Sequence, residues 1–194
     1  MIGVLALQGD YSKHKEILDK LKLSSCEIRY SHQFNEISGL IIPGGESTTM
    51  TDLIDRNGLH KDIYSFSKSK PILGTCAGLI MMARIVNDER VKPLNILDIE
   101  VDRNAYGRQV NSFRDELSVS IGGKFENISA TFIRAPKINR MNKNIEILSS
   151  YNNEPVGIKQ GMHVGLAFHP ELDGITLFHE YTFVKQFNEK SYAA

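Results

Sequence analysis

The stretch PILGTCAGLIMMA, residues 71–83, joins two apolar segments through Gly-Thr-Cys-Ala-Gly. Its first part is typical of a buried strand, and its second part is predicted to be a helix. Cys76 lies at the junction, between Gly74 and Gly78. This is the layout of the G-x-S-x-G elbow of serine hydrolases, with sulfur in place of oxygen. The stretch therefore predicts a strand-to-helix unit with a thiol at its turn.

Two interpretations of Cys76 remain open at this point. A turn with little side-chain bulk exposes the thiol, and the unpaired N–H groups of a helix N-terminus stabilise a thiolate. Free cysteines, however, are commonly small buried core residues. The local sequence does not choose between a nucleophile and a core residue.

Short strands and helices alternate from the N-terminus to residue 86. IGVLALQG (2–9) is a continuous apolar run that predicts a central parallel strand. Apolar positions three and four apart predict a helix over 11–21, with His14 on its apolar face. Further predicted strands are 26–31, 38–45 and 70–75, and further predicted helices are 46–58, capped by Ser or Thr, and 76–86. This order predicts a mostly parallel sheet flanked by helices.

Beyond about residue 93 the pattern changes to strand after strand. The candidates are 94–102, 116–123, 130–136, 145–151, 154–161 and 163–171, followed by an amphipathic helix over 175–190. Antiparallel additions to the parallel core are the simplest interpretation. No linker-like segment interrupts the chain, so we expect one α/β domain over residues 1–194.

Composition excludes several classes of partner. Lys and Arg together number 23, as do Asp and Glu, so the formal net charge is zero and we expect no nucleic-acid partner. No apolar run reaches the roughly 20 residues that span a bilayer, and the N-terminus does not resemble a signal peptide. We therefore expect a cytosolic protein without membrane contact, in which Cys26 and Cys76 are free thiols. The six histidines show no ligand spacing, so no metal is expected.

A second motif, FHPE (168–171), supplies a histidine and a carboxylate. Pro170 favours extended backbone for the residue before it, and side chains two apart on an extended segment point the same way. Glu171 can then accept a hydrogen bond from one imidazole nitrogen of His169 while the other faces a thiol. A lone H-x-E is a weak signal, but the elbow and this pair together predict a catalytic triad.

The segment PGGEST (43–48) is a glycine loop after a predicted central strand. In a doubly wound sheet such a loop lies at the carboxyl edge, beside the loop that carries Cys76. The amides of Gly45 and Ala77 are therefore candidates for an oxyanion hole. The alternative is an ordinary turn before a helix; a phosphate loop is excluded, because the segment has no lysine and does not fit G-x-x-x-x-G-K-[ST].

The motifs of the chain resemble those of a known family. The motifs IGVLALQGD, GLIIPGGESTTM, PILGTCAGLI, RNAYGRQVNSF, FIRAP and FHPEL occur in the order found in class I, triad-type glutamine amidotransferases, and closely resemble the glutaminase subunits of pyridoxal 5'-phosphate synthase. The resemblance spans nearly the whole chain and implies a flavodoxin-like α/β fold. It also implies hydrolysis of L-glutamine to L-glutamate and ammonia for vitamin B6 biosynthesis.

The resemblance implies a role for each matching residue. Cys76 is expected to be the nucleophile, His169 the general base and acid, and Glu171 its orienting carboxylate. The expected glutamine-binding residues are Gly45, Glu46, Ser47, Arg103, Ile133 and Arg134. A zwitterionic amino acid needs a cation and an acceptor, and Arg103 and Glu46 offer those charges. Arg108 and Gln109 are expected to order the loop or to face a partner.

The resemblance further implies a protein partner, a (β/α)₈-barrel synthase subunit that receives the ammonia, and no cofactor. Asp10 and Lys13 depart from the family pattern in the loop expected to contact that subunit. Three other functions remain as alternatives. They are a cysteine peptidase of related fold, a glutaminase serving another synthase, and a non-catalytic regulatory subunit.

Overall fold

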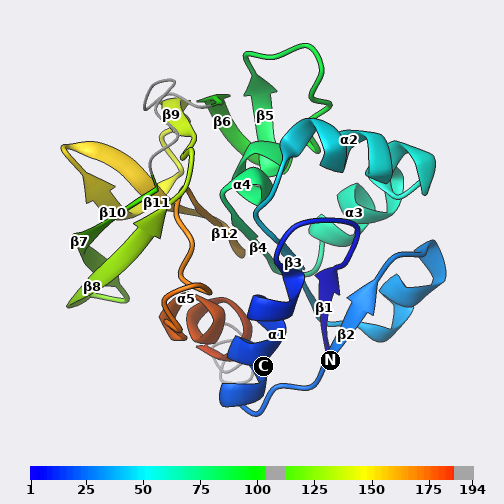
Figure 1. The fold of residues 1–194 in the computed structure, drawn as a ribbon, viewed down its shortest axis with the longest axis horizontal. Helices are drawn as coiled ribbons and strands as arrows, with labels where there is room; N and C mark the ends of the chain where they lie inside the picture. Colours follow the sequence, from blue (N-terminus) through cyan, green and yellow to red (C-terminus); the bar gives the residue numbers. More distant parts are fainter. Residues whose placement is uncertain (104–111, 186–194) are drawn as a thin grey trace.

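The computed structural model describes residues 1–103 and 112–185 (Figure 1). A nine-stranded mixed sheet has the strand order β2-β1-β3-β4-β12-β11-β10-β7-β8. Its first five strands are parallel: β2 (Ser25–Ile28), β1 (Ile2–Leu5), β3 (Gly39–Ile42), β4 (Ile72–Thr75) and β12 (His163–Leu166). This is the 2-1-3-4-5 order of flavodoxin-like sheets. The predicted α/β fold with a parallel core is confirmed.

The remaining strands extend this sheet in antiparallel fashion, as predicted, but β12, which was predicted as one of these additions, is parallel to β4 and belongs to the core. They are β11 (Glu154–Gln160), β10 (Glu146–Tyr151), β7 (Phe113–Ile121) and β8 (Lys124–Phe132). Buried and more exposed residues alternate along the C-terminal half of β7 and of β8, so one face of each strand is buried there. The parallel strands β1, β3, β4 and β12 are instead buried on both faces, which explains their continuous apolar runs.

A second, three-stranded sheet was not predicted. It consists of β5 (Ala83–Val86), β6 (Leu97–Asp102) and β9 (Lys137–Met141). The helix predicted over 76–86 was therefore too long, because it ends at Met82 and the chain continues as β5. Ala83 pairs with Leu97 of β6, a contact that local periodicity does not reveal.

The helices cover both faces of the parallel strands. In Figure 1, α1 (Tyr11–Lys20) and α5 (Leu177–Glu180) lie on one side, and α2 (Ser47–Arg56), α3 (His60–Ser67) and α4 (Ala77–Met82) lie on the other. A 3₁₀ segment (Ser31–Glu36) precedes β3, and a π-helical turn (Tyr181–Lys185) follows α5. None of the described helices is long and apolar enough to cross a membrane.

Three details of the helices differ from the predictions. Helix α3 was not predicted at all. The cap of α2 is Glu46 rather than Ser or Thr, since its carboxylate accepts a hydrogen bond from the Thr49 N–H at 2.7 Å. The last predicted helix, 175–190, contains α5 and the π-helical turn, and its residues 186–190 lie outside the described residues, as do Arg108 and Gln109.

The glycines of the elbow allow α4 to pack directly on the sheet. A Cβ atom at Gly78 would lie 2.0 Å from the Ile42 carbonyl oxygen, and one at Gly74 would lie 2.8 Å from the backbone of Gly78. A side chain at either position would push the helix away from β3 and β4. The carboxyl ends of β3, β4 and β12 therefore open at one edge of the sheet, close to the start of α4.

Candidate active site

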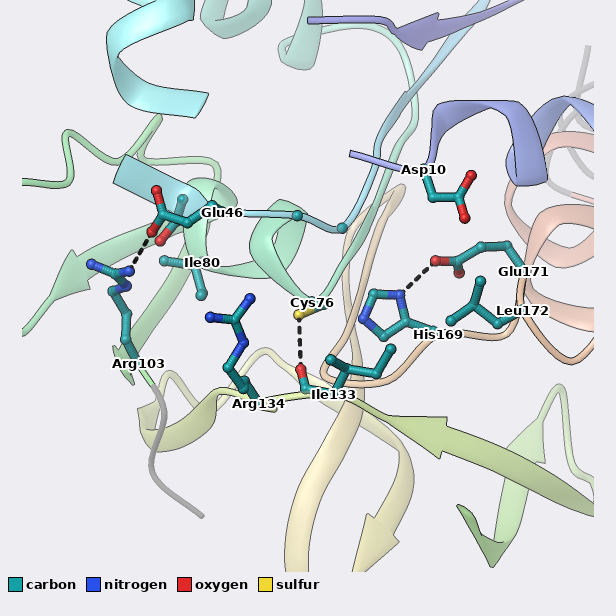
Figure 2. Close-up of a pocket in the computed structure, with 13 residues that line it drawn as sticks. Asp10, Glu46, Cys76, Ile80, Arg103, Ile133, Arg134, His169, Glu171 and Leu172 are labelled. Atoms are coloured by element: carbon teal, nitrogen blue, oxygen red, sulfur yellow. Dashed lines mark hydrogen bonds and ion pairs between the residues drawn. The ribbon is translucent and has the colours of Figure 1, made fainter. Parts of the chain in front are cut away.

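A pocket opens at this edge of the sheet (Figure 2). Its lining includes every predicted site residue except Ala77: Gly45, Glu46, Ser47, Cys76, Arg103, Ile133, Arg134, His169 and Glu171. Asp10, Gly44, Ile80 and Leu172 complete it. Residues as distant in sequence as Asp10 and Leu172 thus meet at this edge of the sheet.

Cys76 forms a sharp backbone turn between β4 and α4. Its φ of 50° and ψ of −104° lie in a region that only glycine adopts without strain. The Cys76 N–H donates to the Leu166 carbonyl oxygen at 2.8 Å, and the thiol donates to the Ile133 carbonyl oxygen at 3.6 Å. These two contacts hold the sulfur at the pocket floor, where the residue is 6% exposed.

His169 lies beside Cys76 and directly follows the last buried residues of the β12 segment. Its backbone N–H donates to the Thr131 carbonyl oxygen at 2.9 Å, which ties it to β8. Its Nδ1 lies 2.7 Å from Glu171 Oε1, so it donates its proton to the carboxylate. Figure 2 shows the imidazole between the sulfur of Cys76 and the carboxylate of Glu171. The structure therefore brings together the three residues predicted to form a triad.

The charge state of His169 follows from its two partners. Burial disfavours the imidazolium, but hydrogen bonds and charges from Cys76 and Glu171 outweigh burial and raise the pKa of His169 to about 10. At neutral pH the histidine is therefore protonated beside the thiol. The protonated imidazole is the form that can give a proton to a leaving group bound beside the sulfur.

The glycine loop after β3 is shaped around two side chains. A Cβ atom at Gly44 would lie 2.4 Å from Cε1 of His169, so only glycine leaves room for the imidazole. Gly45 has a φ of 144°, and a Cβ there would lie 2.3 Å from Oε1 of Gln8. That oxygen accepts a hydrogen bond from the Glu46 N–H at 3.0 Å.

Gln8 is a residue that sequence analysis missed. It anchors the glycine loop from the end of β1, although it does not line the pocket. The sequence feature that could have indicated Gln8 is its position at the carboxyl end of a predicted central strand, because the carboxyl ends of parallel strands meet at one edge of the sheet.

The charged residues at the pocket mouth form pairs with each other. Arg103 donates to Glu46 Oε1 at 2.6 Å and to Asp88 Oδ2 at 2.5 Å. Burial opposes the charge on Glu46, but hydrogen bonds from Thr48 and Thr49 prevail and lower its pKa to about 2. Arg103 and Glu46, predicted as separate contacts for a zwitterion, thus neutralise one another in this structure.

Arg134 differs from Arg103 in this respect. Its backbone has a φ of 44°, and its guanidinium extends into the pocket between Arg103 and Cys76 (Figure 2). Among the described residues no carboxylate forms an ion pair with it. Arg134 is therefore the available cation of the pocket.

Comparison with known proteins shows the family to which the chain belongs. The model of the SNO glutamine amidotransferase family matches residues 4–189. The chain belongs to this family. A pyridoxal 5'-phosphate synthase subunit PdxT from Oenococcus oeni is 47% identical over 184 residues, which cover 95% of either chain. The protein of the same name from Shouchella clausii is 45% identical over 98% of this chain and 96% of its own length.

A solved structure described as a glutamine amidotransferase is similar in fold as well as in sequence. It superposes with a TM-score of 0.87 at 37% identity, covering 93% of this chain and 96% of its own. That protein thus has the same overall fold as this chain.

Backbone strain at Cys76 is open to a direct test. We expect Cys76→Gly to be about 1 kcal/mol more stable than Cys76→Ala, because glycine accepts a positive φ that costs other residues about 1–3 kcal/mol. Urea unfolding measures the difference. As a control, Ala77→Gly on the adjoining helix should lose about 0.5–1 kcal/mol. Equal stability of the two Cys76 variants would contradict the strain.

The contact between Gly44 and His169 provides a second test. Gly44→Ala should lower glutaminase activity by about 100-fold, because the methyl group displaces the imidazole by roughly 1 Å. The control is Gly58→Ala, whose Cβ meets nothing within 4 Å. Its positive φ costs stability without affecting the site. An active Gly44→Ala enzyme would mean that the imidazole position is not critical.

Proposed function

We propose that this chain is the glutaminase subunit of a pyridoxal 5'-phosphate synthase, in which Cys76, His169 and Glu171 hydrolyse L-glutamine to L-glutamate and ammonia. The observation that carries the proposal is the row of these three side chains in one pocket of a chain that belongs to a glutamine amidotransferase family. Family membership favours this function over a cysteine peptidase or a non-catalytic subunit.

The reaction has two halves. The Cys76 thiolate attacks the side-chain amide carbon of glutamine, and the carbonyl oxygen becomes an oxyanion. The imidazolium of His169 gives its proton to the leaving nitrogen, so ammonia departs and a γ-glutamyl thioester remains. Neutral His169 then takes a proton from water, the resulting hydroxide attacks the thioester, and glutamate leaves as the thiolate re-forms.

Backbone amides supply the oxyanion hole in this proposal. Ala77 is the first residue of α4, and the first N–H groups of a helix have no intrahelical partner. Gly45 follows Gly44 at the His169 side of the pocket, and its backbone carries no side chain that would block an approach. One donor of this kind lowers the barrier by about 3 kcal/mol.

The amino-acid end of glutamine binds at the pocket mouth. Arg134 receives the α-carboxylate, because it is the cation that no described carboxylate neutralises. Glu46, whose Oε1 is held by Arg103 and whose Oε2 is held by Thr48 and Thr49, attracts the α-ammonium through its negative charge. Ser47 Oγ is buried, lines the pocket and has no hydrogen-bond partner among the described residues, which suits it to a polar group of the substrate.

The ammonia is used by a second subunit. We infer a (β/α)₈-barrel synthase subunit as the partner, since the curated relatives named above are subunits of pyridoxal 5'-phosphate synthase. A glutaminase that worked without its partner would waste glutamine, so weak activity alone is expected. The cytosolic location and the absence of a cofactor stay predictions.

A substitution at Arg134 tests the substrate assignment. Arg134→Gln should raise KM for glutamine by about 10-fold or more, because a charge-assisted hydrogen bond contributes about 1.5–3 kcal/mol. Steady-state kinetics of glutamate release give the value. Arg140→Gln, at an 85% exposed side chain, is the control. An unchanged KM in Arg134→Gln would assign the α-carboxylate elsewhere.

The decisive test of function is glutamate release from glutamine, with and without a purified barrel synthase subunit. We expect release that the synthase subunit stimulates and that Cys76→Ala abolishes. Cys26→Ala is the matched control, since Cys26 is the other free cysteine and lies in β2. Release that survives in Cys76→Ala would overturn the nucleophile. Cys76-dependent release that ignores the synthase subunit would point to another partner.

A further inference from the structure

Two buried histidines lie directly behind the proposed triad, and the mechanism above does not use them. His14 of α1 and His179 of α5 are both 0% exposed. His14 Nδ1 lies 2.9 Å from His179 Nε2, so the two rings share a hydrogen bond between residues 165 positions apart. Sequence analysis placed His14 on an apolar helix face and predicted a role for neither histidine.

The other side of His14 faces the triad carboxylate. Its Nε2 lies 3.2 Å from Thr75 Oγ1 and 3.7 Å from Glu171 Oε1. The second distance is too long for a hydrogen bond but short enough for a strong interaction between an N–H dipole and a carboxylate. A continuous buried row therefore runs from His179 through His14 and Glu171 to His169 and Cys76.

His14 and His179 are both neutral. Burial, with the neighbouring His179 and His169, holds the pKa of His14 well below its usual range. Burial also lowers the pKa of His179 to about 3. A neutral imidazole has one N–H donor and one bare nitrogen, so the tautomer of each ring decides the direction of the row.

The contacts select one direction. If His179 donates from Nε2, His14 accepts at Nδ1 and carries its own proton on Nε2, toward Thr75 and Glu171. In the opposite arrangement the bare Nε2 of His14 would face a carboxylate, and the proton on Nδ1 of His179 would be a buried donor, because that nitrogen has no partner among the described residues. An orphaned buried donor and a lone pair beside a negative charge are both costly.

We propose that His14, fixed in its tautomer by His179, is a positioning residue that directs its Nε2–H toward Glu171 and holds this carboxylate in line with His169. The proposal rests on the triad roles assigned under the proposed function. His14 touches neither substrate nor sulfur, so it acts through Glu171.

The surroundings of Glu171 explain why it needs such support. The residue is 3% exposed, and its Oε2 has no hydrogen-bond partner among the described residues. The titratable groups around it are His169 on one side, His14 backed by His179 on another, and Asp10 on the exposed rim of the same pocket. None of the described lysines or arginines forms an ion pair with it.

Neutral donors suit this position better than a cation does. A lysine or arginine behind Glu171 would stabilise the carboxylate but would also cancel its attraction for the His169 imidazolium. The aligned N–H dipoles of His179 and His14 carry no net charge, so they stabilise the carboxylate without cancelling its attraction for the His169 imidazolium. Loss of the His14 N–H should let Glu171 turn away from Nδ1 of His169, which weakens their hydrogen bond and lowers the pKa of His169.

The test compares two substitutions at His14. His14→Met removes both ring nitrogens, whereas His14→Gln keeps an amide N–H near the place of Nε2. We expect His14→Met to lower the pKa of His169, followed by ¹⁵N-histidine NMR, by about one unit. We expect kcat for glutamine to fall about 10-fold or more while KM changes less than about twofold. His14→Gln should recover most of both quantities.

Two further measurements separate positioning from folding. In a Glu171→Gln background, His14→Met should cause no further change in the pKa of His169, since the effect passes through the carboxylate. His179→Phe keeps the ring volume but frees the tautomer of His14, so it should cause a smaller shift in the same direction. This variant and His14→Gln keep the test informative if His14→Met does not fold.

The outcomes are distinct. A normal titration of His169 in folded His14→Met, or an equal effect in the Glu171→Gln background, would overturn the proposal. If His14→Met does not fold, a wild-type pKa of His169 in His179→Phe would do the same. Wild-type protein that releases no glutamate with its partner would instead contradict the proposed function. The two failures are distinguishable, because the NMR titration of His169 reports the effect of His14 without any turnover.

Discussion

The conformation of Cys76 is the constraint on which the rest of the site depends. A positive φ at a residue other than glycine is held in place only when its surroundings leave no alternative. Here Gly78 packs against the Ile42 carbonyl and Gly74 against Gly78, so α4 approaches the sheet closely, and the Cys76 N–H is bound by Leu166 of β12. The packing energy of the parallel core thus stabilises a strained turn and brings the sulfur next to the histidine that follows β12.

Charge is distributed in the pocket according to depth. At the mouth, Arg103, Glu46 and Asp88 form a partly buried network, in which pairing offsets the cost of removing the charges from water. At the floor a single carboxylate, Glu171, is buried against neutral and titratable imidazoles. A buried carboxylate is costly unless it is paired, so the attraction of Glu171 for the proton on His169, at 2.7 Å, is correspondingly strong. The same burial that destabilises Glu171 therefore raises the basicity of His169.

Glycine has a different physical reason at each position of the site. Gly44 leaves room for the His169 imidazole, and Gly45 combines a positive φ with close approach to Gln8. Gly74 and Gly78 allow the backbones of strand and helix to touch. In each case a methyl group would collide with an atom that the fold or the proposed chemistry needs in place. Glycine is therefore required at these positions for close packing as well as for backbone conformation.

The sequence by itself determined the features that depend on neighbouring residues. The apolar runs predicted the parallel strands, the spacing of Gly74, Cys76 and Gly78 predicted the elbow, and His-Pro-Glu predicted a histidine oriented by a carboxylate. Only the tertiary structure decided which distant groups meet. Helix α4 ends at Met82 because Ala83 pairs with Leu97 of β6. Arg103 forms an ion pair with Glu46, and His14 and His179 meet behind Glu171. Local periodicity reports which face of an element is buried, whereas the partner across a buried contact is set by the packing of elements far apart in the chain.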